Sequence, residues 1–175
     1  MWLSKRQKEQ AKRPLARPRA AMAGFAACLI LLSACGFQPV YGPGAPALGL
    51  RDQITIAAPS DEEGFALVRR LEERLGTASG PYELRAEILI TEDAVGILTD
   101  GTITRYNVQG AVPWQLMAGE QVLTSGREDS FTSYSATSTT VATIFAQRDA
   151  RSRLMVILAD RIVAELLRTA PDWTP

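Results

Sequence analysis

Histidine is absent from all 175 residues of this chain. Hydrolases with a Ser-His-Asp or Cys-His arrangement need an imidazole as general base near neutral pH, and the commonest zinc sites use one as a ligand. The sequence therefore excludes these reactions and sites. Catalysis would have to use carboxylate, lysine or tyrosine chemistry, and the sequence has neither a phosphate-cradling glycine loop nor a zinc-ligand spacing.

Cysteines and long apolar runs are also scarce. The apolar run from Ala20 to Leu32 has thirteen residues without a charge, whereas a helix that spans a bilayer needs about 20 apolar residues. The two cysteines are Cys28, inside this run, and Cys35, just after it. With 46% hydrophobic and 22% charged residues, the chain has the composition of one globular domain with an extension.

The N-terminal segment has the parts of a secretory signal. Residues 1–19 carry seven basic side chains against one acid, Glu9, and the short apolar run follows them. The next residues, Leu32-Ser33-Ala34-Cys35, resemble the lipobox of bacterial lipoproteins, in which small residues fit a peptidase site and the thiol takes a diacylglycerol. We therefore predict a lipoprotein signal peptide over residues 1–34; a buried helix or a short anchor is the alternative.

Cleavage before Cys35 would leave 141 of the 175 residues. Cys35 would be the lipid attachment residue, and two or three acyl chains such as palmitate would hold the protein on a membrane. Cys28 would leave with the signal, so the mature chain could form no intrachain disulfide. Because glycine and not aspartate follows the cysteine, the resemblance to lipoproteins implies the periplasmic face of the cell outer membrane.

A tether and then a folded domain follow the anchor. Residues 35–50 are rich in glycine and proline, which favours a tether over a helix or strand. Its start, Cys35-Gly-Phe-Gln-Pro-Val-Tyr-Gly42, resembles the opening of the LptE family of lipopolysaccharide-assembly lipoproteins. We expect an LptE-like domain over residues 51–170 and a C-terminal tail over residues 171–175.

Hydrophobic periodicity predicts the elements of this domain. Alternation predicts strands at 53–57, 82–91, 102–116 and 121–134, with a hairpin turn at Asp100-Gly101. Helical spacing predicts a helix from an N-cap at Ser60 or Asp61 to Gly76, and another over 139–168. The order is β-α-β-β-β-α, an α+β fold with two helices on one face of a four-stranded, largely antiparallel sheet.

Several details of this prediction can be tested by the structure. The apolar stripe of the first helix is expected at Phe65, Val68, Leu71 and Leu75, and that of the second at Val141, Ile144, Phe145, Met155, Leu158, Ile162 and Leu166. Pro113 predicts a bulge or an edge position, and broken alternation predicts a bulge within 126–129. Pairs Asp149–Arg153 and Arg161–Glu165 are expected on the second helix, with Pro171 just past its end.

The family resemblance implies a function without chemistry. LptE proteins form a complex with the large LptD β-barrel, plug its lumen, help it assemble and bind lipopolysaccharide on its way to the outer leaflet. The resemblance implies no enzymatic activity and no cofactor. Nucleic-acid binding is disfavoured because the mature chain has 12 basic and 18 acidic residues, a net charge of about −6.

Contact with lipopolysaccharide phosphates would depend on local arginines, because the net charge gives no general attraction. The candidates are Arg85 and Arg105 on outward strand positions, and Arg148 and Arg151 on the second helix. The alternative for each is a surface salt bridge or a contact to the barrel wall.

Two other functions stay open from the sequence. One is an accessory lipoprotein of another envelope lipid transporter, and the other is a lipid-anchored enzyme that uses carboxylates or Tyr106. The adjacent acids Glu62-Glu63, Glu72-Glu73 and Glu92-Asp93 would be its carboxylates, but neighbouring side chains on a helix or strand point apart.

Overall fold

A computed structural model describes residues 49–57, 59–77, 80–137 and 139–173 of the chain. The elements in order are β1 (Ile54–Ile56), α3 (Glu62–Leu75), β2 (Tyr82–Ala86), β3 (Leu89–Ile97), β4 (Ile103–Ala118), β5 (Gln121–Ser135) and α4 (Thr140–Trp173). The predicted signal peptide, Cys35 and nearly all of the predicted tether lie outside the described residues. Leu50, the last residue of that tether, is buried at 1% exposure.

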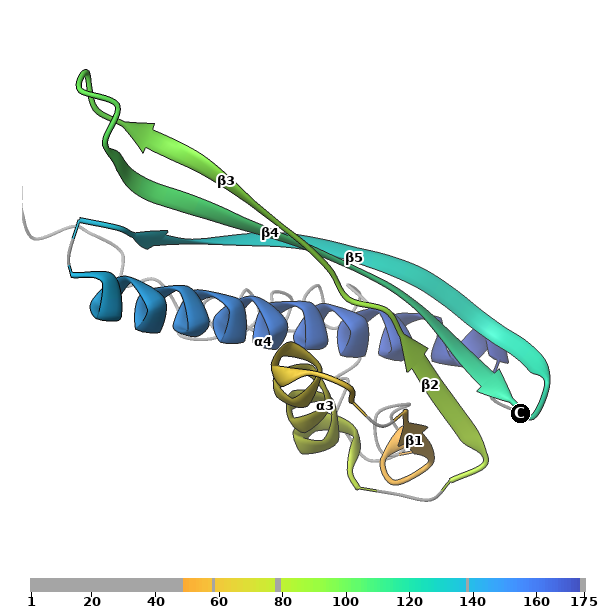
Figure 1. Ribbon diagram of the computed structural model, residues 1–175. Coiled ribbons are helices and arrows are strands. Elements are labelled where there is room, and N and C mark those ends of the chain that lie inside the picture. The colour runs from red at the N-terminus through yellow and green to blue at the C-terminus, as the bar shows by residue number, and fades with distance from the viewer. Residues whose placement is uncertain (1–48, 58, 78–79, 138, 174–175) are drawn as a thin grey trace, which may run out of the picture. The chain divides into compact units, whose positions relative to one another are not determined.

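The sheet is organised around β4. β2 and β3 pair along one edge of β4 and β5 pairs along the other, all antiparallel, while β1 pairs parallel with β2. Both helices lie on the same side of the sheet (Figure 1). The predicted α+β fold with two helices on one face is confirmed.

The strand count differs from the prediction because of Pro113. In place of the single strand predicted over 82–91, the structure has two strands, β2 and β3, which are separated at Glu87 and Ile88 and extend to Ile97. The sheet therefore has five strands and not four. At the interruption, the Glu87 amide donates to the Pro113 carbonyl at 3.0 Å, but proline has no N–H to return the bond. The predicted bulge or edge position of Pro113 is wrong: it lies within central β4, in register with Arg127 of β5.

The second predicted bulge is also wrong. Residues 126–129 of β5 pair with β4 in unbroken register, and the irregularity lies between the partners of Leu116 and Met117. The alternation breaks at Gly126 because the ring of Trp114 occupies the space beside it. A Cβ on Gly126 would lie 2.6 Å from Cζ2 of that ring.

The hairpin between β3 and β4 is where the sequence predicts it. The Gly101 amide donates to the Leu98 carbonyl at 2.9 Å, and the Leu98 amide donates to the Thr102 carbonyl at 2.9 Å. Gly101 has a φ of 85°, which glycine adopts without steric cost. The loop therefore has three residues, 99–101, rather than the two that the Asp-Gly pair predicts.

Helix α3 begins and ends as predicted, but its buried stripe agrees with the prediction only in its second half. The Asp61 carboxylate accepts from the Gly64 amide at 2.7 Å, and Gly76 ends the helix with a φ of 93°. The buried residues are Gly64, Leu67, Leu71 and Leu75. Phe65 is 63% exposed, so its predicted place in the core is wrong, whereas the predicted burial of Leu71 and Leu75 is confirmed.

Helix α4 is longer than predicted. It continues past residue 168 to Trp173, with Pro171 inside its last turn. There the Trp173 ring packs edge-on against Tyr82 at 5.6 Å, and its Nε1 donates to Oγ1 of Thr169 at 3.2 Å. This tertiary packing keeps the last turn helical where the sequence predicts a stop. At the other end, the predicted stripe residues Val141, Ile144 and Phe145 are exposed.

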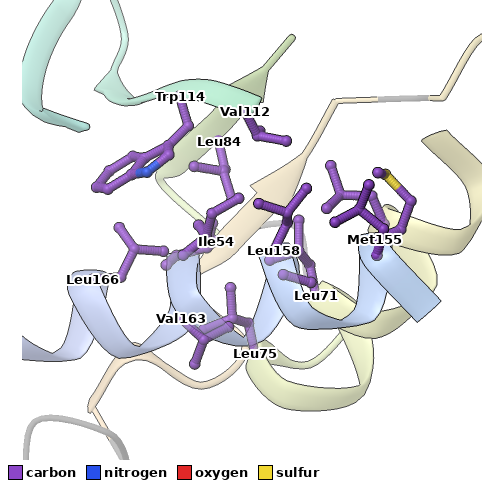
Figure 2. Close-up of a cluster of buried hydrophobic side chains, with 14 of the residues drawn as sticks. Ile54, Leu71, Leu75, Leu84, Val112, Trp114, Met155, Leu158, Val163 and Leu166 are labelled. Carbon is purple, nitrogen blue, oxygen red and sulfur yellow. The ribbon is translucent and has the colours of Figure 1, made fainter. Parts of the chain in front are cut away.

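The core lies between the sheet and the two helices. Figure 2 shows Leu84, Val112 and Trp114 of the sheet facing Leu158, Val163 and Leu166 of α4 and Leu71 and Leu75 of α3. Helix α4 approaches β4 closely at Gly110, where an added Cβ would lie 2.8 Å from Cδ2 of Leu154 and 3.1 Å from Cδ1 of Leu158. A residue without a side chain is therefore needed at the middle of β4.

We expect Gly110→Ala to lower the free energy of unfolding by about 1–3 kcal/mol, because the added methyl overpacks the contact with Leu154. Chemical denaturation monitored by circular dichroism measures the change. Gly49→Ala is the matched control, since nothing lies within 4 Å of its added Cβ. Equal unfolding midpoints for the two variants would contradict the close approach at Gly110.

Candidate functional site

A polar cluster joins β3 and β5 to both helices. It consists of Glu63, Glu92, Tyr134, Gln147 and Arg151, and is called the Glu92 cluster below. Arg151 donates from Nε to Glu92 at 2.7 Å and from Nη1 to Glu63 at 2.9 Å. Glu92 also accepts from Gln147 at 2.8 Å and from the Tyr134 hydroxyl at 3.2 Å. The two carboxylate side chains are each 19% exposed and that of Arg151 is 35% exposed.

The electrostatics of the cluster favour its charged form. Burial raises the pKa of the Glu92 carboxyl, but hydrogen bonds from Gln147 and Arg151 outweigh it, so that pKa is lowered. The hydrogen bond to Glu92 raises the pKa of Arg151. Burial, and then the charge of Glu92, raise the pKa of Tyr134. The cluster is therefore an ion-pair network that ties the start of α3 and the first half of α4 to the sheet.

Sequence reasoning proposed Arg151 as a lipopolysaccharide contact and missed Glu92 as its partner. The signal was available: Leu84, Ala86, Ile88 and Ile90 alternate toward the helices, so the next even-numbered residue, Glu92, is a carboxylate on the inward face. The neighbouring Asp93 faces outward, where its Oδ2 accepts from Gln109 at 2.9 Å. The prediction that adjacent acids point apart is confirmed at this pair.

The other three candidate arginines are exposed and lie on two different surfaces. Arg85 of β2 donates from Nε to Glu83 at 2.8 Å. Arg105 of β4 and Arg148 of α4 are exposed, and neither makes an ion pair within the described ranges. Arg148 borders a groove of about 360 Å³ between α3 and α4, beside Glu62 and Arg151. The structure thus brings Arg148 and Arg151 together but leaves Arg85 and Arg105 on the sheet.

The sheet face opposite the helices, called the open face below, is mostly polar, with apolar positions at Leu89, Ala111 and Pro113. Its positions alternate with the buried residues Val108 and Val112 of β4. Along β3, β4 and β5 they include Thr91, Asp93, Arg105, Asn107, Gln109, Gln115, Arg127, Asp129, Phe131 and Ser133. Arg85 joins this face opposite Gln115. One exposed ring, Phe131, stands among these polar side chains at 66% exposure.

Ion pairs elsewhere hold the helices together. Arg70 of α3 donates from Nε and Nη2 to the two carboxylate oxygens of Asp160 in α4, both at 3.0 Å. The predicted pair Asp149–Arg153 is confirmed at 2.9 Å. The predicted pair of Arg161 with Glu165 is wrong. Arg161 donates to the backbone carbonyl of Asp129 in β5 instead, and Glu165 pairs with Arg168.

Three further findings bear on chemistry. Tyr106, the tyrosine that the enzyme hypothesis invokes, stacks on Tyr134 with ring centroids 5.3 Å apart. Across the part of the chain that the structure describes, histidine, cysteine and carboxylate side chains form no group that could hold a metal ion. In those same ranges, no helix combines the length and hydrophobicity required to cross a membrane.

Comparison with protein families gives one match. The family model of LptE, described as lipopolysaccharide-assembly, matches residues 52–166. This range begins just before β1 and ends within α4, so it includes every strand of the sheet. No curated protein matches the chain.

Solved structures share the fold. A lipoprotein from Caulobacter crescentus CB15 is 22% identical, with a TM-score of 0.59 over 74% of this chain and 98% of its own. The rare lipoprotein B of Shewanella oneidensis is 14% identical, with a TM-score of 0.53 over 69% and 96%. A minor lipoprotein of Acinetobacter baumannii is 16% identical, with a TM-score of 0.51 over 67% and 94%. At these identities the likeness shows the fold.

We expect the Glu92 cluster to make stability depend on acid pH. The pKa of Glu92 is lowered in the folded chain, so its stabilisation is complete above the ordinary glutamate pKa of about 4.3 and is lost as pH falls through the lowered value. Glu92→Gln should lower the free energy of unfolding by about 1–2 kcal/mol at pH 7, and its difference from the native chain should shrink toward pH 3.

Urea unfolding at pH 7 and pH 3 measures this change. Glu120→Gln, in the exposed turn between β4 and β5, is the matched control and should change stability little at either pH. A Glu92→Gln effect that is the same at both pH values would show that the carboxylate charge contributes nothing.

Proposed function

This chain belongs to the LptE family of lipopolysaccharide assembly, and on that premise we propose that it is an outer-membrane lipoprotein that complexes with and plugs the LptD β-barrel. In this role it assists the assembly of the barrel and the delivery of lipopolysaccharide to the outer leaflet. The family is one of non-enzymatic accessory lipoproteins. The observation that carries the proposal is the family match over residues 52–166.

The surface of the folded domain supports a role as a plug. A body inside a water-filled barrel needs polar surfaces toward the lumen, and the open face presents amide, hydroxyl and charged side chains along three strands. The ion pairs between α3, α4 and the sheet give a rigid body. The chain thus combines an apolar face that the helices cover with a polar open face that is compatible with a water-filled lumen.

The anchor of the proposed lipoprotein is Cys35. Residues 32–35 have the lipobox pattern, and acyl chains contribute about 0.8 kcal/mol for each buried methylene. Lipidation at Cys35 would hold the domain at the periplasmic face of the outer membrane. A membrane-spanning helix is then unnecessary.

The proposed lipopolysaccharide contacts are the exposed arginines Arg85, Arg105 and Arg148, of which Arg85 is paired with the exposed Glu83. Arg151 is the weakest of the four candidates, because its guanidinium is held by Glu63 and Glu92. Three separate arginines suit local phosphate contacts on a domain whose net charge is negative.

We expect Cys35→Ala to release the protein from membranes, because it removes the thiol that carries the lipid. Fractionation and partitioning into Triton X-114 measure the change. Cys28→Ala is the matched control. Because Cys28 lies inside the predicted signal peptide, this variant should partition like the native chain. Equal partitioning of the Cys35→Ala variant and the native chain would refute the lipid anchor.

We expect depletion of the chain to lower the amount of mature LptD in the outer membrane, and LptD to co-purify with the chain from detergent-solubilised membranes. Immunoblotting and mass spectrometry of the purified complex measure both. Normal LptD levels together with a different co-purifying partner would replace this proposal with an accessory subunit of another envelope lipid transporter.

A further inference from the structure

The open face has an aromatic centre. Phe131 of β5 is 66% exposed and lies in register with Gln109 of β4, which lies in register with Thr91 of β3. Most of this phenyl ring is in contact with water and so contributes little to packing within the domain. Burying it against a ligand would recover the hydrophobic free energy that its exposure forgoes.

The side chains around this ring can form directional hydrogen bonds. Asn107, Gln109, Asp129, Ser130 and Phe131 line a shallow groove of about 350 Å³. The hydrogen bond from Gln109 to Asp93 fixes the amide of Gln109 and leaves its carbonyl oxygen free to accept. The carboxylate of Asp129 is already engaged by Arg127, whereas amides offer donors and acceptors side by side. Such groups match adjacent hydroxyls of a sugar ring.

We infer that the open face binds the saccharide part of lipopolysaccharide, with a sugar ring stacked on Phe131 and its hydroxyls bonded to Asn107 and Gln109. A sugar has an apolar C–H face and a polar rim, which this arrangement complements. An acyl chain would need apolar walls on both sides, which the polar neighbours of Phe131 do not provide. The inference rests on the proposed function and names a site for it.

The position and charge of Arg105 indicate the charge and the length of the ligand. Arg105 lies on the same face of β4, four residues from Gln109, or about 14 Å at 3.4 Å per residue. Its guanidinium makes no ion pair within the described ranges, whereas Arg127 on the same face is paired with Asp129 at 3.2 Å. An unpaired guanidinium complements a phosphate or carboxylate. The ligand that reaches both residues is therefore an acidic oligosaccharide.

The test uses the full chain in non-ionic detergent and de-acylated lipopolysaccharide, which keeps the phosphates and acidic sugars but has no acyl chains. Isothermal titration calorimetry should show binding. Phe131→Ala should raise the Kd about fivefold to tenfold by removing the stacking surface. Phe131→Tyr keeps an aromatic ring and should leave the Kd close to that of the native chain. Phe65→Ala is the matched control, because Phe65 is 63% exposed on α3.

The charge is tested separately. Arg105→Gln should raise the Kd for the acidic oligosaccharide at low salt, with a smaller effect at high salt. It should not change the Kd for an oligosaccharide from which the phosphates and acidic sugars have been removed. Arg153→Gln, an exposed arginine of α4 paired with Asp149, is the matched control. Circular dichroism of each variant checks that the fold is intact.

The outcomes separate this inference from the proposed function. Binding of intact lipopolysaccharide without binding of the oligosaccharide would overturn the saccharide site and leave the function in place. Binding of neither would remove the lipopolysaccharide contact as well. Equal effects of Phe131→Ala and Phe65→Ala on the Kd for the oligosaccharide would also overturn the site. The same holds if Phe131→Ala abolishes binding to LptD but leaves binding of the oligosaccharide unchanged.

Discussion

The packing of α4 along one face of β4 is the interaction on which the rest of the structure depends. Alternate residues of β4 are buried beneath α4, and Gly110 lets the helix approach the strand at its middle. Because side chains alternate across a strand, covering one face determines the position of every residue on the other. The polar open face is therefore a consequence of how α4 is seated.

Polar contacts fix the position of α4 along the sheet, which apolar packing alone would leave variable. Apolar packing is non-directional, whereas the hydrogen bonds of Arg151 to Glu63 and Glu92 hold α4 at one position along the sheet. The bidentate pair of Arg70 with Asp160 does the same between the two helices. With both ends of the interface held in this way, the domain can present its open face as a rigid surface.

Part of the fold and of the site could be predicted because its signals are local. The N-cap at Asp61, the turn at Gly101 and the alternation of β4 each depend on a few neighbouring residues. Predictions failed where a distant residue decided the outcome. Pro113 of β4 interrupts the neighbouring strand at Glu87, whose amide bonds to the Pro113 carbonyl. Phe65 is outside the core because α3 buries Gly64 and Leu67 instead.

The sequence by itself determined the α+β class, the place of both helices, the absence of imidazole chemistry and the resemblances to a lipobox at Cys35 and to the LptE family. Only the tertiary structure decided that Arg151 is engaged, because its partners Glu63 and Glu92 lie far away in the chain. Arg151 meets Glu92 across 59 positions, and Arg105 forms no ion pair with any residue that the structure describes. The aromatic centre of the open face likewise depends on the pairing register, which sets Phe131 beside Gln109.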